Sequence, residues 1–282
     1  MSVTRDMRIS EIIIYPIKST AGVSVDCCDV GARGLAMDRR WMVIDAHGEC
    51  LTGREIPRLT QIRAHVENGG LRVEAPAASE LLVRAPRPSA ATRPVRVLND
   101  ECLAVCFDAS IDAWFTRVLG TPCHLVYMNE RCERPVEPGF GRAGDLTSFA
   151  DGYPLLIVSS ASLDDLNTRL AEPVSMRRFR PNLVVDGCLP YEEDEWCCIR
   201  AGAVHFDGVE NCERCVFTTI DPDSGEWHPL QEPLRTLSGY RRRPDGGVLF
   251  GRNLIPRSFG RLRVGDRVSV ESTPATAPGG AS

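Results

Sequence analysis

The sequence contains no long apolar stretch. No segment approaches the roughly 20 apolar residues that span a bilayer, and the polar N-terminus MSVTRDMRIS lacks the apolar core of a secretory signal peptide. The composition, 43% hydrophobic and 25% charged, is typical of a soluble globular protein rather than a disordered one. We therefore expect a cytoplasmic protein with no membrane partner, whose 12 cysteines are mostly reduced thiols.

An excess of positive charge is also missing. The formal net charge is -5 and the isoelectric point is about 5.6, which disfavours binding to nucleic-acid polymers. No internal repeat is present. The length of 282 residues is enough for a substantial core in one large domain or two ordinary ones.

The sequence lacks the second half of a zinc site. Cys212 and Cys215 stand three apart in NCERCVFTTIDPDSG, but no other C-x-x-C follows or precedes them. His205 and His228 do not belong to an H-x-x-x-H pair. A structural zinc ion needs four ligands, usually supplied as two such pairs, so this interpretation is weak.

A redox dithiol is not favoured either, because such motifs lower the thiol pKa at a helix N-terminus. The residues that follow Cys215, VFTTI, are β-branched and apolar and predict a strand. Two interpretations remain open for the cysteine pair. The cysteines are buried small hydrophobic residues, or one thiolate at the end of a strand ligates a metal that an organic cofactor carries.

A cofactor with an anionic phosphate would need cationic anchors, and the sequence offers Lys18, Arg39, Arg54 and Arg180. Each alone is more typical of a solvated surface charge. Lys18 and Ser19, however, follow a strand and a proline turn, where they can present an ammonium and a hydroxyl to a phosphate. Arg180 precedes Asn182 next to an apolar run; arginine grips phosphate bidentately, and the amide suits a pterin-like ring edge.

Short strands dominate the predicted secondary structure, which favours a β-rich α+β fold. Hairpins are expected at 39–54, with a return strand through Leu51 and Thr52, and at 64–76, with the turn at Asn68. Helices are expected at 110–120, 160–170 and 232–240. Further strands are expected at 7–15, 79–86, 94–107, 154–159, 182–187, 203–208, 215–220, 248–255 and 266–272.

A series of stretches in fixed order resembles the MOSC-domain proteins: YPIKS, FADGYPLLIVSSASLDDLN, FRPNLVVDG, CERCVFTTIDPDSG, EPLRTL and FGRNLIPR. The resemblance includes the β-rich domain that precedes MOSC in the amidoxime-reducing components and in bacterial relatives of the YcbX type, and it extends from Ile9 to Val270. It implies a smaller β-rich N-terminal domain at 1–122 and a MOSC β-barrel-like domain at 123–272. The Pro- and Gly-rich residues 273–282 predict a disordered tail.

The resemblance also implies a molybdenum cofactor, Mo-molybdopterin, with Cys215 as the protein ligand to the metal and Cys212 as a neighbour without that role. The residues that match cofactor contacts of the family are Lys18, Ser19, Arg39, Asp151, Arg180 and Asn182. The chain departs from the mitochondrial proteins at Gly152 and Tyr153, which replace small hydroxyl residues, and at Glu213, which replaces a small polar residue.

The implied activity is the reduction of small N-hydroxylated compounds such as hydroxylamines, amidoximes and hydroxylaminopurines. Electrons would come from a separate reductase or ferredoxin-like protein, because no cysteine follows Cys215 that could hold an iron–sulfur cluster. Asp151 is one candidate for a catalytic proton donor and Asp221 is another, and neither is strongly indicated. Asp221 is more typical of a turn residue. The alternative implied function is a non-catalytic cofactor carrier or a sulfur-transfer protein.

Overall fold

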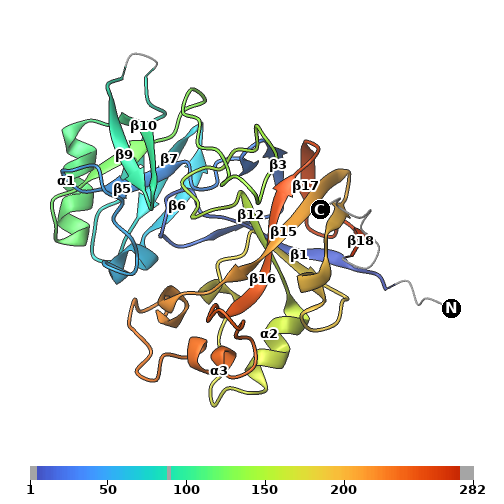
Figure 1. The fold of residues 1–282 in the computed structure, drawn as a ribbon. Coiled ribbons are helices and arrows are strands. Elements are labelled where there is room, and N and C mark those ends of the chain that lie inside the picture. Colours follow the sequence, from blue (N-terminus) through green and yellow to red (C-terminus); the bar gives the residue numbers. More distant parts are fainter. Residues whose placement is uncertain (1–4, 88–89, 274–282) are drawn as a thin grey trace.

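The structure, a computed structural model, describes residues 5–87 and 90–273 (Figure 1). Its described residues form an α+β fold in which strands dominate, as the sequence predicts. One lobe carries α1 and the strands β5–β11, and the other carries the largest sheet together with α2 and α3. No helix in the described ranges is both long and apolar enough to cross a bilayer.

The largest sheet has eight strands in the order β18-β14-β15-β16-β12-β13-β1-β2. β12 and β13 pair in parallel, and α2 connects them; the other neighbours are antiparallel. Buried aliphatic side chains of this sheet, such as Ile12 and Leu183, form its core. The bounds are β1 Arg8–Ile14, β2 Val23–Val25, β12 Leu155–Ser159, β13 Leu183–Asp186, β14 Cys198–Ala201, β15 Val204–Glu213, β16 Leu249–Pro256 and β18 Val268–Ser272.

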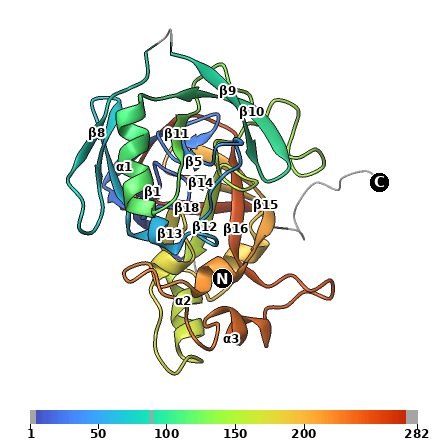
Figure 2. The same ribbon diagram turned by 90° about the vertical axis from the view of Figure 1, so that its left-hand side faces the viewer.

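Three smaller sheets complete the molecule, in the orders β5-β11-β10-β9, β6-β7-β8 and β17-β3-β4. α1 lies beside β11 and β8 (Figure 2). Its Phe115 side chain is fully buried. The bounds are β3 Cys27–Gly31, β4 Gly34–Leu35, β5 Trp41–Ile44, β6 Arg63–Glu67, β7 Gly70–Glu74, β8 Leu81–Val83, β9 Thr92–Val97, β10 Asp100–Cys106, β11 His124–Tyr127 and β17 Gly260–Arg263.

Strands from the two ends of the chain share sheets. β1 pairs with β13, and β3 pairs with β17, which lies more than two hundred residues later. β11, which begins at His124, pairs with β5 and β10. The boundary expected at residues 122 and 123 stays a prediction; the sheets themselves draw strands from both of its sides.

The three predicted helices form, although α2 ends at Asn167, three residues before the predicted end at residue 170. α1, Ala109–Leu119, ends at Gly120, whose φ of 73° is in the left-handed region that glycine tolerates. α2, Ser160–Asn167, begins after Ser159, whose hydroxyl accepts a hydrogen bond from the Ser162 amide. α3, Leu234–Ser238, follows Pro233. Four short 3-10 turns lie within Pro57–Gln61, Met176–Arg178, Glu192–Glu195 and Val216–Thr219 in the described ranges.

The strand predicted at 215–220 is wrong: Val216–Thr219 is a 3-10 turn. The Thr218 hydroxyl donates to the Cys215 carbonyl over 3.0 Å, and the Thr219 hydroxyl donates to the Val216 carbonyl over 2.8 Å. These local side-chain hydrogen bonds close the turn and override the β preference of the same residues.

The return strand predicted through Leu51 and Thr52 is also wrong: Cys50 makes an isolated bridge to Ile44 and the Leu51 amide donates to the Val43 carbonyl over 2.9 Å, but no strand forms at these two residues. Thr52 instead leaves the sheet, because its amide and hydroxyl both donate to the Glu55 carboxylate, over 3.0 and 2.9 Å. The chain after Cys50 is therefore a loop. Of the predicted tail, 274–282 lie outside the described residues.

Candidate active site

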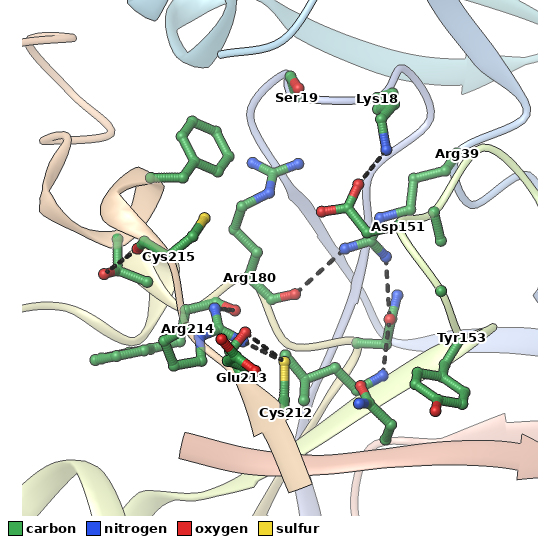
Figure 3. A pocket seen from close by; sticks show the side chains of 18 of the residues that line it. Lys18, Ser19, Arg39, Asp151, Tyr153, Arg180, Cys212, Glu213, Arg214 and Cys215 are labelled. Carbon is green, nitrogen blue, oxygen red and sulfur yellow. Dashed lines mark hydrogen bonds and ion pairs between the residues drawn. The ribbon is translucent and has the colours of Figure 1, made fainter. Parts of the chain in front are cut away.

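A cavity of about 300 Å³ lies between the end of β15, the segment before β12 and the loops that follow β1. Every residue expected to hold the cofactor or its metal lines this cavity, although they come from distant parts of the sequence (Figure 3). These residues are Lys18, Ser19, Arg39, Asp151, Arg180, Asn182 and Cys215.

Cys215 is the most accessible thiol of the protein. It follows the end of β15 and precedes the 3-10 turn at Val216–Thr219. All 12 cysteines lie in the described ranges, and Cys215 alone among them is exposed. Arg54, from the loop after β5, places its Nη1 3.8 Å from the Cys215 sulfur. The thiol is therefore reachable from the cavity and lies beside a positive charge.

Cys212 differs from Cys215 although both line the cavity. Its sulfur accepts a hydrogen bond from Arg214 Nη1 over 2.9 Å. Burial raises the pKa of the Cys212 thiol despite the neighbouring guanidinium. Arg214 also donates from Nη2 to the Phe179 carbonyl over 2.6 Å. Cys212 is thus held as a neutral thiol, and the two cysteines do not form a disulfide.

Lys18 enters the cavity as a buried cation with a defined partner. Its residue is only 6% exposed, and its Nζ donates to the Phe149 carbonyl over 2.7 Å and to the Asp151 carboxylate. The charge of Lys18 holds the pKa of Asp151 well below its usual range. Asp151 is therefore ionised near neutral pH, which disfavours the proton-donor role expected for it.

Arg39 and Arg180 both stack on the ring of Tyr15, with 4.4 and 4.2 Å between each guanidinium carbon and the ring centroid. Arg39 donates to Asp38 over 2.6 Å, and Asp38 is fully buried. Arg180 donates to the Thr20 carbonyl over 2.6 Å but has no carboxylate partner in the described ranges. Burial lowers the pKa of Arg180 to about 10. Arg180 is therefore a desolvated cation that an anionic ligand would neutralise.

The backbone at three of these residues is strained. Ser19, Arg39 and Arg180 have φ values of 68°, 49° and 55°, in the left-handed region that non-glycine residues seldom adopt. Such conformations persist where the surrounding structure fixes them, and they cluster at ligand-binding sites. The loops that carry these side chains are therefore shaped for the cavity.

Family comparison explains why these residues converge. The chain matches the MOSC N-terminal beta barrel domain over residues 6–122 and the MOSC domain over residues 145–269. Mitochondrial amidoxime reducing component 2 of Rattus norvegicus is 36% identical over 278 residues, which cover 92% of this chain and 82% of that protein. The chain belongs to the MOSC-domain family.

Other relatives of this MOSC protein carry two kinds of name. Mitochondrial amidoxime-reducing component 1 of Mus musculus is 37% identical over 279 residues, covering 92% of this chain and 81% of that protein. Molybdenum cofactor sulfurase of Oryza sativa subsp. japonica is 34% identical over 270 residues, covering 87% of this chain but only 32% of that protein. The MOSC protein therefore spans about a third of the rice relative.

Asn182 of the MOSC protein lines the cavity and makes several hydrogen bonds within the protein. Its side chain is 1% exposed, and its Oδ1 accepts from Arg39 Nη1 over 3.0 Å and from the Leu156 amide over 3.2 Å. Its Nδ2 donates to the Ile13 carbonyl over 3.2 Å. The amide thus ties β1 to the start of β12 and orients Arg39, and its contact with a cofactor stays a prediction.

Asp221 lies outside the residues that line the cavity. It pairs with Arg178 over 2.9 Å and accepts the amides of Asp223 and Ser224, as a turn residue does. Some lining residues were not predicted as site residues, because only the fold shows that their side chains face the cavity. These are Tyr153, Glu210, Glu213, Arg214 and Phe217, whereas Arg54, a cationic anchor that the sequence offers, also lines the cavity.

Proposed function

We propose that this MOSC protein is a molybdenum-dependent oxidoreductase that reduces small N-hydroxylated compounds, with electrons from a separate reductase or ferredoxin-like protein. The rat and mouse relatives named amidoxime-reducing components support this substrate class. The observation that carries the proposal is the exposed Cys215 thiol in one cavity with cations that lack carboxylate partners.

The residues present fit Mo-molybdopterin, which combines a metal, a dithiolene and a phosphate. Cys215 supplies a soft sulfur ligand, which suits a thiolate-bound metal. Arg54, Arg180 and Arg214 have no ion pair in the described ranges, so an anion that enters the cavity would meet uncompensated positive charge. Within 5–87 and 90–273, no group of three His, Cys, Asp or Glu residues could hold a metal ion alone. A metal at Cys215 would therefore take its other ligands from an organic group.

The proposed roles follow from these contacts. Cys215 holds the metal, and Lys18, Ser19, Arg39 and Arg180 hold the anionic part of the cofactor. When bound, the cofactor supplies the electrons of the reaction. Asp151 fixes the Lys18 ammonium at the cavity wall. Asn182 orients Arg39, as its hydrogen bonds indicate.

The overall reaction converts an N–OH group and two electrons and two protons into an N–H group and water. The protein residues bind and orient the substrate, and the low pKa of Asp151 removes it as a ready source of either proton. The protons therefore reach the substrate from another group or from solvent in the cavity.

The test compares Cys215→Ser with Cys106→Ser, a half-buried thiol on β10 that does not line the cavity. Each protein is expressed in a host that makes the cofactor, and its metal content is measured by mass spectrometry. Reduction of benzamidoxime is then followed with a chemical electron donor. We expect activity in the wild type and in C106S but none in C215S, with the fold of C215S intact by circular dichroism. Undiminished reduction by C215S, or wild-type protein without molybdenum, would contradict the proposal.

A separate electron donor is part of the same proposal. Purified protein should show no iron–sulfur absorbance and should not turn over with NAD(P)H alone. Turnover with NAD(P)H as the only donor would contradict this part.

A cofactor carrier or sulfur-transfer protein is the second candidate, and the similarity to the rice molybdenum cofactor sulfurase favours it. The two candidates differ in the fate of bound cofactor. A carrier passes cofactor to an added apo-enzyme faster than it reduces a hydroxylamine, whereas a reductase keeps its cofactor through many turnovers.

A further inference from the structure

The cavity is electrically divided. Arg54 contacts the Cys215 sulfur, and Arg180 packs 5.4 Å from the ring centroid of Phe217, so the uncompensated cations lie near the proposed metal ligand. The lining residues Glu210 and Glu213 are carried instead by β15. Figure 3 shows Glu213 at the side of the cavity opposite Lys18 and Ser19.

The acidic side has more negative than positive charge. Glu213 Oε2 lies 3.3 Å from Arg243 Nη2, and Glu210 Oε1 lies 3.6 Å from Arg243 Nη1. Arg243 also pairs with Asp245 over 3.0 Å. Three carboxylates thus share the Arg243 guanidinium. Arg214, which also lines the cavity and whose guanidinium donates to Cys212 and the Phe179 carbonyl, offsets one of the two remaining negative charges and leaves an excess of one. This excess lies beside a cavity whose other side is basic.

The two acidic side chains are fixed in different ways. The Tyr153 hydroxyl donates to Glu210 Oε2 over 2.9 Å, so both oxygens of Glu210 have partners. Glu213 is 60% exposed, and in the described ranges its Oε1 has no contact. A Cβ atom on Gly247 would lie 2.9 Å from Glu213 Oε2, so the Glu213 side chain packs closely against the Gly247 backbone in addition to its contact with Arg243. Glu213 therefore offers a positioned, partly free carboxylate at the cavity.

We infer that Tyr153, Glu210 and Glu213 form a selectivity wall that favours N-hydroxylated substrates carrying a cationic group. This inference rests on the proposed function, since it assumes that substrate enters this cavity. A carboxylate accepts hydrogen bonds from a planar amidinium in pairs, and the Tyr153 ring offers a face to the same cation. The basic side attracts the anionic cofactor and the acidic side the cationic substrate, so each ligand is steered to its own end.

The first experiment measures binding by calorimetry, on cofactor-loaded protein, of benzamidine and of its neutral isostere benzamide. Glu213→Gln is compared with Glu101→Gln, an exposed glutamate paired with Arg96 on the four-stranded sheet. We expect benzamidine to bind wild type and E101Q more tightly than benzamide. Because Glu213 is largely exposed, E213Q should weaken benzamidine binding by only about fivefold and leave benzamide binding unchanged. Equal binding of both ligands to the wild type, or a preference that survives E213Q, overturns the inference.

The second experiment separates this inference from the proposed function. Turnover of benzamidoxime is compared with that of its 4-trimethylammonio derivative, whose charge does not depend on pH. We expect a lower KM for the cationic substrate, an advantage that E213Q removes while kcat changes little. If neither substrate is reduced, the proposed function fails. If both are reduced with equal KM, only the selectivity inference fails.

Discussion

Arg180 and Arg39 stack on the same tyrosine, yet their loss should have opposite effects on stability. Arg39 pairs with Asp38, whose side chain is fully buried, whereas Arg180 has only a carbonyl acceptor. Removing Arg39 would leave Asp38 as a buried and unpaired charge. Removing Arg180 would relieve a desolvated cation. Comparing the two substitutions therefore tests whether the uncompensated charge of Arg180 destabilises the cofactor-free protein.

The magnitudes follow from the contacts. The decrease in the pKa of Arg180 to about 10 corresponds to about 3 kcal/mol of destabilisation. We retain about 2 kcal/mol of this, because the desolvated side chain still has some surface open to solvent. The Thr20 carbonyl loses its donor in Arg180→Met, which costs about 1 kcal/mol. We expect R180M to raise the free energy of unfolding of cofactor-free protein by about 1 kcal/mol. Arg39→Met should lower it by about 3 kcal/mol.

The assay is urea unfolding at pH 7, followed by circular dichroism, of wild type, R180M and R39M prepared without cofactor. The same series with loaded protein gives the second half of the test. With cofactor bound, R180M should be less stable than wild type. Bound cofactor stabilises the folded protein, and R180M lacks one of the cations that would bind it. If R180M is destabilised in the cofactor-free protein as strongly as R39M, the idea of an uncompensated cation is wrong.

Other predictions concern single groups. Iodoacetamide should modify Cys215 before any other cysteine, as read by peptide mass mapping, and a faster reaction at Cys28 or Cys123, whose thiol pKa values burial raises to about 11, would contradict this. Glu193 is fully buried, and burial raises the pKa of its carboxyl above the ordinary value of 4.5. The stability that this carboxyl contributes is therefore fully present below pH 4.5 and is lost as pH rises. In unfolding experiments over a pH series, Glu193→Gln should become more stable relative to wild type as pH rises. Lys18 lowers the pKa of Asp151, so the stability contributed by the Asp151 carboxylate is present above pH 3.8 and is lost as pH falls below it. Asp151→Asn should thus be less stable than wild type by about 1 kcal/mol at pH 7, with the difference vanishing at low pH, since this carboxylate is 68% exposed.

The strands and helices could be predicted where local signals agree with the fold. The run of isoleucines before Pro16 and the Asn68 turn predicted β1 and the β6–β7 hairpin, and Gly120 marked the end of α1. The segment after Cys215 could not be predicted in this way. Its threonine hydroxyls close a turn through bonds to carbonyls three residues earlier, which a strand propensity does not contain.

The site residues divide in the same way. Those within recognisable stretches, such as Lys18, Arg180 and Cys215, could be proposed from the sequence, and the structure brings them to one cavity. Tyr153 and Arg214 could not, because the direction of a side chain from a loop depends on tertiary packing. Asn182 was placed at the site, but its partners depend on the approach of β1 to β12, which sequence spacing does not show.

The pairing of β1 with β13 and of β3 with β17 has a consequence for biogenesis. Lys18 and Ser19 directly follow β1, so their loop reaches the cavity only after residues near 185 have been synthesised and β1 has docked. A fragment that begins after β11 would lack β1, so the edge of β13 that pairs with β1 would be open. Such an open strand edge is prone to intermolecular pairing. The complete cavity can therefore form only after nearly the whole polypeptide has been synthesised, since its lining extends from Lys18 to Asn253.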